Sequence, residues 1–154
     1  MVGVGARASG STRDSRKDIG YGIYDKLDFE VITETAGDVE ARIKVRIGEV
    51  AQSLKLVRQL ISKLRRNAET QLAVELGELQ QEEGHFTWGI SESARGDNLH
   101  CLLLDKEGRI DRLFVRSASY PNWPALTVAV QGDIIPDFPL INKSFELCYA
   151  CIDR

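Results

Sequence analysis

The residues best suited to chemistry are two cysteines close to the end of the chain. Cys148 and Cys151 are separated by two residues in the sequence CYACIDR, which runs to Arg154. On a helix or in a tight turn, side chains three positions apart face the same way, so both thiols can reach one metal centre. A disulfide, a structural zinc site, a redox-active dithiol and one half of a larger metal site are the alternatives for such a pair.

The other potential ligands favour the last alternative. A structural zinc ion needs four ligands, and beyond the pair the chain offers Cys101, His85 and His100, together with carboxylates. His100 and Cys101 are neighbours in a predicted strand and point to opposite faces, so a complete zinc site is the less favoured interpretation. A thioredoxin-like dithiol begins a helix in a βαβ unit, which the sequence does not show. By elimination, the two thiols are predicted to ligate a metal whose other ligands lie on another chain.

Composition limits the classes of protein to consider. The 154 residues are 43% hydrophobic and 28% charged, which is typical of one soluble globular domain, here residues 1–154. No apolar run approaches the roughly 20 residues that span a bilayer, and no signal peptide is recognisable. We therefore expect a cytoplasmic chain that reaches a membrane only through partners. The net charge of −3, without a dense basic patch, argues against nucleic-acid binding.

One long amphipathic helix is the strongest structural signal. It is predicted from Asp38, a suitable N-cap, to the basic sequence KLRR ending at residue 66, a length of roughly 40 Å. Its apolar residues recur three or four positions apart and form one stripe: Ile43, Ile47, Val50, Leu54, Val57, Ile61 and Leu64. This stripe needs a cover. Either the short helices fold back over it, or the chain completes its core against another polypeptide.

Shorter elements surround this helix in an α+β fold with a loop-rich C-terminal tail. Residues 3–18 are expected to be irregular, and residues 24–32 to form a turn and a short strand. Residues 67–83 are a weak helix or a linker. Two strand-like segments within 85–117 include a hairpin with its tip at 106–108. Asn122 opens a short helix with Pro124 in its first turn, and residues 133–145 are expected to be extended.

Two polar segments have an ordinary explanation and a functional one. SESARGDNLH, residues 91–100, lies between apolar strands and is favoured as a hydrophilic loop. ARASGSTRDSRKD, residues 6–18, is equally compatible with a basic surface loop.

In their order, however, several segments match a known family. ARASG with RDSRKD, YDKLDFEV, GDVEARIKVRIGEVAQSLKLVRQ, ESARGDNLH, NWPAL with GDIIPDFPLINKSF, and CYACIDR cover nearly the whole chain. They resemble the C-terminal half of the large subunit of membrane-bound, energy-converting nickel–iron hydrogenases. The catalytic subunit of respiratory complex I shares most of these motifs but lacks the terminal Cys-x-x-Cys. The resemblance implies half of a large-subunit fold, completed by a partner chain.

The resemblance also implies roles for individual residues. Cys148 would be a terminal nickel ligand and the proton acceptor, and Cys151 would bridge nickel and iron. Arg95 would lie over the metals and polarise bound hydrogen or hold a cyanide ligand. Ser144 would lie near the diatomic ligands of iron, and Glu146 would assist proton transfer in place of the usual aspartate. Glu-Leu-Cys replaces the usual Asp-Pro-Cys ahead of the first thiol.

The implied cofactor is a nickel–iron centre whose iron carries two cyanides and one carbon monoxide. An iron–sulfur cluster on a partner small subunit and a magnesium ion belong to the same expectation. Because only one Cys-x-x-Cys is present, we expect a split subunit whose N-terminal half carries the first pair, assembled with complex I-like membrane subunits on the cytoplasmic membrane. The implied reaction is reversible reduction of protons to dihydrogen. The alternatives are a complex I-like oxidoreductase subunit that passes electrons to quinone or another acceptor without nickel, and an interaction module with an incidental dithiol.

Overall fold

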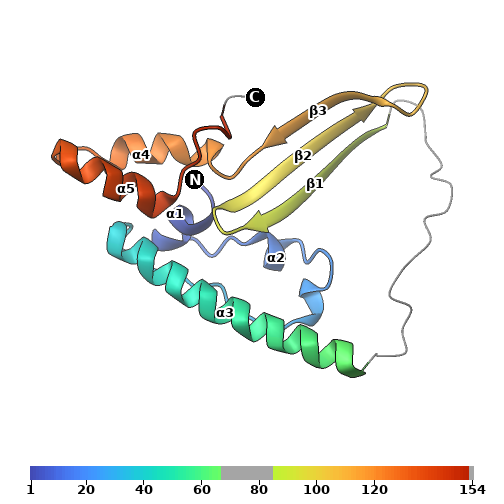
Figure 1. Cartoon of the computed structure of the whole chain (residues 1–154), viewed down its shortest axis with the longest axis horizontal. Helices are drawn as coiled ribbons and strands as arrows, with labels where there is room; N and C mark the ends of the chain where they lie inside the picture. Colours follow the sequence, from blue (N-terminus) through green and yellow to red (C-terminus); the bar gives the residue numbers. More distant parts are fainter. Residues whose placement is uncertain (67–84, 153–154) are drawn as a thin grey trace.

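The computed structural model describes residues 1–66 and 85–152 (Figure 1). It confirms the α+β class. A long helix, α3 (Val39–Arg66), lies along one side, and a three-stranded sheet of β1 (Phe86–Ser93), β2 (Gly96–Leu104) and β3 (Ile110–Arg116) projects from the centre of the molecule. Short helices fill the space between the sheet and α3 and pack on the N-terminal end of α3.

The predicted long helix is confirmed, including its start. The Ala41 amide donates to Oδ1 of Asp38 at 2.7 Å, which satisfies one of the free N–H groups of the first turn. Lys63, Arg65 and Arg66 lie in the last turn, where cations are favoured by the helix dipole. With 28 residues the helix is about 42 Å long.

The apolar stripe of α3 is not covered by the described part of the chain. Its seven residues are between 46% and 66% exposed, with Ile43 and Ile61 the least and Ile47 the most accessible. The core of the molecule uses a different face of the helix, which contributes Ala41, Val45 and Leu56. The expectation that short helices of this chain cover the stripe is therefore wrong for the residues described.

The N-terminal segment is helical where the sequence predicted irregular structure. It forms α1 (Gly3–Ala8), α2 (Ser15–Asp18) and a 3-10 turn, η1 (Tyr24–Lys26). Val4 and Ala8 of α1 pack against Ala41 and Val45 of α3. The helix was missed because its small residues, which are poor evidence for any element, are what permit this close approach to α3.

The short strand predicted after this segment is absent from residues 27–34. The chain there runs extended along α3, where Phe29 is buried against Leu56. Gln59 binds the backbone on both sides of Asp28, accepting from its N–H at 2.9 Å and donating to its C=O at 2.6 Å. Helix side chains thus take the backbone hydrogen bonds that a neighbouring strand would have made.

The predicted hairpin is confirmed. β2 and β3 are joined by a turn in which the Gly108 amide donates to the Asp105 carbonyl at 3.1 Å. The hydrophilic loop favoured for residues 91–100 is wrong, because β1 and β2 pair antiparallel through Glu92 opposite Asp97 and leave only a tight turn at residues 94–95. Their charged side chains face other charged groups of the protein.

The C-terminal segment packs as a small helical layer against the start of α3 (Figure 1). It comprises η2 (Tyr120–Asn122), α4 (Trp123–Ala129), η3 (Ile135–Asp137) and α5 (Phe138–Phe145). α4 is confirmed, whereas residues 133–145 were expected to be extended. Pro136 and Pro139 lie at the first positions of η3 and α5, where a proline needs no amide partner, so they start these helices.

Two further observations complete the description. None of the described helices is both long and apolar enough to cross a bilayer. The weak helix or linker predicted for residues 67–83 falls outside the described residues.

Candidate functional site

The cysteine pair lies on a tail that follows α5 and is held by two serines. The Cys148 amide donates to Oγ of Ser119 at 3.1 Å, and Oγ of Ser117 donates to the Cys151 carbonyl at 3.4 Å. Both serines are buried between β3 and η2, and both cysteines are half-buried. No disulfide joins any of the three cysteines, all of which the structure describes. The backbone of both cysteines is therefore held by hydrogen bonds, and neither sulfur is used in a disulfide.

Arg95 is brought to this tail from a distant part of the sequence. It lies in the turn between β1 and β2, and its Nε donates to the carbonyl oxygen of Glu146 at 2.7 Å. Glu146 precedes Cys148 by two residues. The predicted arginine and the predicted thiols thus belong to one region of the structure.

The turn that carries Arg95 docks on the start of α1 through a contact between glycine backbones. A Cβ added to Gly3, whose φ is +62°, would lie 2.1 Å from the Arg95 carbonyl oxygen. Asn122 stabilises the same contact: its Oδ1 accepts from the Val2 amide at 2.7 Å, and its Nδ2 donates to the carbonyls of Val2 and Arg95. The side chain predicted to cap α4 instead fixes the position of Arg95.

Ser144 is buried in the last turn of α5. Its Oγ accepts from Nε of Arg42 at 2.8 Å and donates to the Ile141 carbonyl at 2.6 Å. The one hydroxyl proton is therefore used within the helix. A contact from Ser144 to a ligand of iron would require that proton to leave Ile141, and the predicted role stays a prediction.

Glu146 ends α5 in the left-handed conformation, with φ 56° and ψ 38°. Its Oε2 lies 3.0 Å from Nη1 of Arg46 in an ion pair that is partly exposed. This arrangement gives the carboxylate a contact with α3, and its predicted part in proton transfer is untested.

Arg42 and Arg46 were not identified from the sequence. They lie one turn apart on α3 and both reach the end of α5, Arg42 at Ser144 and Arg46 at Glu146 and the Ser144 carbonyl. The position of Arg42 in the sequence could have identified it. Arg42 lies between Ala41 and Val45 on the core-facing side of the helix, where an arginine is rare unless its charge is paired or hydrogen-bonded.

The described residues offer an incomplete donor set for the metal centre that the resemblance implies. Among residues 1–66 and 85–152, no group of three or more His, Cys, Asp or Glu side chains could hold a metal ion. The two tail thiols are soft ligands that suit nickel and low-valent iron, but they make only half of a four-thiolate set. The other half, and the ligands of any magnesium ion, would have to come from outside these residues. Cys101 is half-buried in β2 opposite Trp88 and Phe114.

A second group of charged residues lies on the other side of α1. Arg7, which is 1% exposed, contacts Oε1 of Glu49 at 2.6 Å, Oε1 of Glu92 at 2.9 Å and Oδ2 of Asp14 at 3.5 Å. Arg16 pairs with Asp14 at 2.6 Å. These five residues, which we call the Arg7 cluster, join α1, α2, α3 and β1. The basic surface loop expected for residues 6–18 is wrong for its buried charges, because Arg7 and Asp14 are enclosed with partners, whereas Arg13, Lys17 and Asp18 are exposed.

The electrostatic environment differs among the carboxyl groups of the Arg7 cluster. Burial opposes ionisation of Asp14, but the hydrogen bonds and charge of Arg16, with the charge of Arg7, outweigh it and hold the pKa of Asp14 below its ordinary value. Burial dominates at Glu49 and raises its pKa despite the contact with Arg7. The anionic form of Asp14 is thus stabilised by its surroundings, whereas that of Glu49 is destabilised.

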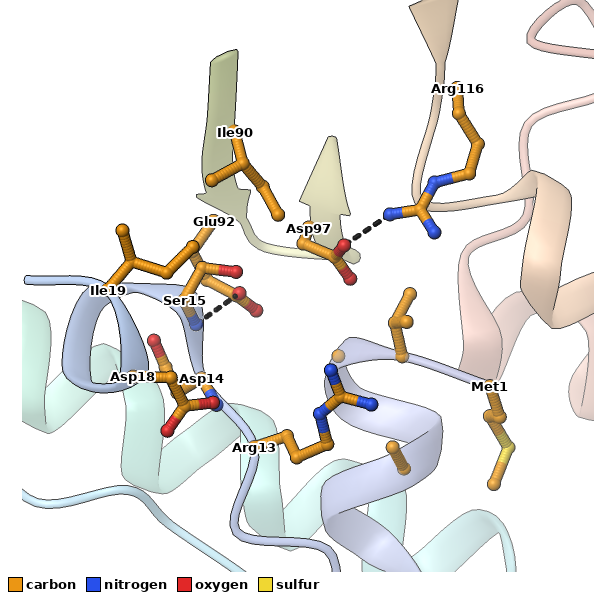
Figure 2. Close-up of a pocket in the computed structure, with 13 residues that line it drawn as sticks. Met1, Arg13, Asp14, Ser15, Asp18, Ile19, Ile90, Glu92, Asp97 and Arg116 are labelled. Atoms are coloured by element: carbon orange, nitrogen blue, oxygen red, sulfur yellow. Dashed lines mark hydrogen bonds and ion pairs between the residues drawn. The ribbon is translucent and has the colours of Figure 1, made fainter. Parts of the chain in front are cut away.

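A cavity of about 180 Å³ adjoins the Arg7 cluster between α1, α2 and the base of the sheet (Figure 2). Figure 2 shows the Ser15 amide bound to Glu92 and the Asp97–Arg116 ion pair on its wall. No cysteine lines this cavity. It is a polar space distinct from the tail that carries the thiols.

The comparisons with known proteins agree with this architecture. The family described as the respiratory-chain NADH dehydrogenase, 49 Kd subunit, matches residues 1–83 and 73–154. The chain belongs to this family. The Arg95 turn and the cysteine tail both fall within the match.

Several relatives have names that indicate hydrogen or quinone chemistry. Formate hydrogenlyase subunit 5 of Escherichia coli is 36% identical over 99% of this chain and 26% of its own length. The carbon monoxide-induced hydrogenase of Rhodospirillum rubrum is 34% identical over 100% of this chain and 41% of its own. An NADH-quinone oxidoreductase subunit of Salinispora tropica is 36% identical over 97% of this chain and 38% of its own.

A solved structure shares the fold across the full chain. It is the membrane-bound sulfane sulfur reductase, an archaeal respiratory membrane complex, with a TM-score of 0.88 and 27% identity over 100% of this chain and 42% of the matched chain. This chain therefore spans between about a quarter and two fifths of the length of these relatives. Half of a 49 kDa-type fold, as the sequence predicted, is confirmed.

Proposed function

We propose that this chain is the part of a nickel–iron hydrogenase large subunit that supplies Cys148 and Cys151 as two of the four thiolate ligands of the metal centre. The observation that carries the proposal is the convergence of Arg95 on the cysteine tail, through the 2.7 Å hydrogen bond from its Nε to Glu146. The hydrogenases among the relatives support the same assignment. The reaction would be reversible conversion of dihydrogen to two protons and two electrons.

The proposed centre would carry cyanide and carbon monoxide on iron and, when bound, supply the two-electron redox chemistry of dihydrogen. The chain's own groups would do the rest. Cys148 would accept and release a proton at Sγ, since a thiolate is a base whose strength falls when it ligates a metal. Arg95, always charged and planar, would offer hydrogen-bond donors to anionic or polarised ligands without losing its proton. Glu146 would pass protons onward from the first thiol.

The proposal requires partners. The exposed stripe of α3 is an apolar surface about 33 Å long, from Ile43 to Leu64, that matches the need of the fold for its other half. We propose that the N-terminal half of the large subunit carries the first thiol pair. The same half would pack against the apolar stripe of α3. An iron–sulfur small subunit would carry electrons, and membrane subunits of a complex I-like assembly would hold the complex at the cytoplasmic membrane.

Metal analysis combined with infrared spectroscopy tests the proposal. Protein purified with its partners should contain nickel and iron and show the stretching bands of iron-bound carbon monoxide and cyanide. Cys148→Ser and Cys151→Ser should each remove nickel and hydrogen-dependent dye reduction. Cys101→Ser is the matched control and should keep both, because Cys101 lies in β2. Active protein without nickel would refute the proposal.

A complex I-like subunit without nickel is the second candidate. The quinone oxidoreductase relative is as similar to this chain as the hydrogenases are, and Glu-Leu-Cys replaces the hydrogenase-like Asp-Pro-Cys. In that case electrons would pass to quinone or another acceptor, and both cysteine-to-serine variants would retain full activity.

A further inference from the structure

We propose that Arg42 and Arg46 are positioning residues that set the direction of the cysteine tail, an inference that rests on the proposed function for the role of the thiols. With Arg95 they form what we call the arginine clamp, three guanidinium groups that converge on residues 144–146. This segment leads directly into Cys148, so its orientation decides where the thiol points.

Arg46 binds the segment by its side chain and its backbone. Nη1 donates to Oε2 of Glu146 at 3.0 Å, and Nη2 donates to the Ser144 carbonyl at 3.3 Å. Glu146 is the one non-glycine residue with positive φ in the described ranges 1–66 and 85–152. A left-handed residue that carries a Cβ is strained and persists only when contacts hold it. Arg46 and Arg95 supply such contacts, one at the carboxylate and the other at the carbonyl.

Arg42 acts from inside the protein. It is 3% exposed, its Nε donates to Oγ of Ser144 at 2.8 Å and its Nη1 donates to the Gly37 carbonyl at 2.6 Å. Its guanidinium also lies over the ring of Phe145 at 4.0 Å. The charge is therefore engaged by two neutral oxygens and an aromatic face, and two of these three contacts lie in the last turn of α5.

The chemistry of the helix end explains why arginines serve here. The last carbonyls of a helix lack partners and carry the negative end of its dipole, which favours cations. A guanidinium can hold two acceptors in a fixed geometry, which an ammonium cannot do. Since α3 is the longest rigid element, arginines on it tie the tail to a fixed reference, while Arg95 ties it to the sheet.

The test uses alkylation of the cysteines by iodoacetamide, measured by mass spectrometry on protein purified with its partners from nickel-depleted cultures. Cys101 is the internal reference. Arg46→Met should raise the rate for Cys148 relative to Cys101 about five- to tenfold, because two hydrogen bonds that hold the segment are lost. Arg46→Lys should restore part of the difference. Glu146→Gln should give a smaller rise, and adding it to Arg46→Met should have little further effect.

Lys44→Met is the matched control, because it removes an exposed ion pair with Glu40 on the same helix without touching residues 144–146. The clamp is refuted if Arg46→Met and Lys44→Met give the same rates, or if Arg46→Lys gives no recovery. Arg42→Met, with its buried charge, serves only as a supporting variant and requires an unchanged circular dichroism spectrum. Absence of nickel from the nickel-replete wild type would refute the proposed function alone, since the alkylation rates would still report the clamp.

Discussion

Two groups of arginines, one built around Arg7 of α1 and the other at the end of α5, differ in what they bind. The Arg7 cluster sets two guanidinium groups against the carboxylates of Asp14, Glu49 and Glu92. The arginine clamp sets three guanidinium groups against one partly exposed carboxylate, that of Glu146, and otherwise binds neutral oxygens.

The difference in partners shows which group of arginines has its charges paired within the described chain. Buried charges are tolerated where opposite charges pair with them, and each carboxylate of the Arg7 cluster contacts a guanidinium group of the described chain. The arginine clamp brings three guanidinium groups to the segment that leads into Cys148, and one carboxylate is among their hydrogen-bond partners. Such a surrounding suits thiolates and the anionic centre that they are proposed to bind. We therefore expect the Arg7 cluster to stabilise the fold, and we propose that the clamp serves the cysteine tail.

The largest expected effect comes from removing the central cation of the Arg7 cluster. Arg7→Met would leave Glu49 and Glu92 without their guanidinium partner in a buried space, with Asp14 still paired to Arg16, so we expect a loss of about 3–5 kcal/mol in unfolding free energy. Chemical denaturation of the purified protein measures it. Arg13→Met is the control, because the Arg13 side chain is exposed and only its carbonyl contacts Arg7; it should stay within about 0.5 kcal/mol. A small effect of Arg7→Met would mean that the cluster does not stabilise the fold.

A smaller loss is expected where the Arg95 turn meets α1. Gly3→Ala would place a Cβ 2.1 Å from the Arg95 carbonyl at a residue whose φ is +62°. Strain and displacement should cost about 1–3 kcal/mol and move Arg95 away from Glu146. Hydrogen-dependent activity should therefore fall further than the unfolding free energy alone implies. Gly22→Ala, also at positive φ but with open space around it, is the control; equal losses of activity in both would contradict the docking role.

The pH dependence of stability should separate two acids of the Arg7 cluster. The folded pKa of Asp14 is lowered, so its contribution is present above its unfolded pKa and is lost as the pH falls through the folded value. The folded pKa of Glu49 is raised, so its contribution is present below its unfolded pKa and is lost as the pH rises through the folded value.

Unfolding measured from pH 3 to pH 7 should therefore change in opposite ways in two variants. Asp14→Asn should flatten the loss of stability below about pH 4, and Glu49→Gln should flatten the loss above it. Parallel curves for the wild type and both variants would contradict this account of the buried charges.

The smallest effect on stability is expected at Glu146. Glu146→Gly removes a partly exposed ion pair worth up to about 1 kcal/mol and relieves a strained backbone by a similar amount. The unfolding free energy should therefore stay within about 0.5 kcal/mol of the wild type. Because the link to Arg46 is lost, the tail should nevertheless become easier to alkylate at Cys148. A large loss of stability would show that the carboxylate supports the fold rather than the tail.

Elements with a strong local pattern could be predicted from the sequence. The apolar period and Asp38 fixed α3, and the turn after Asp105 fixed the β2–β3 hairpin. The helices at 133–145 differ from the extended segment expected there, because Pro136 and Pro139 lie in the first turns of η3 and α5, where a proline is tolerated. The strand expected near Phe29 is absent because Gln52 and Gln59 of α3, 22 and 31 residues away from their partners, bind its backbone, which no local pattern reveals.

Only those residues of the candidate site that belong to a recognisable sequence motif could be predicted. Cys148, Cys151 and Arg95 follow from the resemblance, and the structure brings the segments of all three together. Arg42, Arg46 and Ser119 are ordinary residues in sequence, and they acquire a role only through tertiary contacts with residues 144–148. Contacts between segments about 30 to 100 residues apart are beyond what period and spacing can predict.

The most direct test of the central claim is nickel and iron analysis with infrared spectroscopy on the purified complex, for the wild type and for Cys148→Ser. We predict about one nickel per chain and iron-bound carbon monoxide and cyanide bands in the wild type, with both signals absent from the variant. Equal spectra and equal nickel contents in the two proteins, or an active wild type without nickel, would contradict the assignment of the tail thiols as metal ligands.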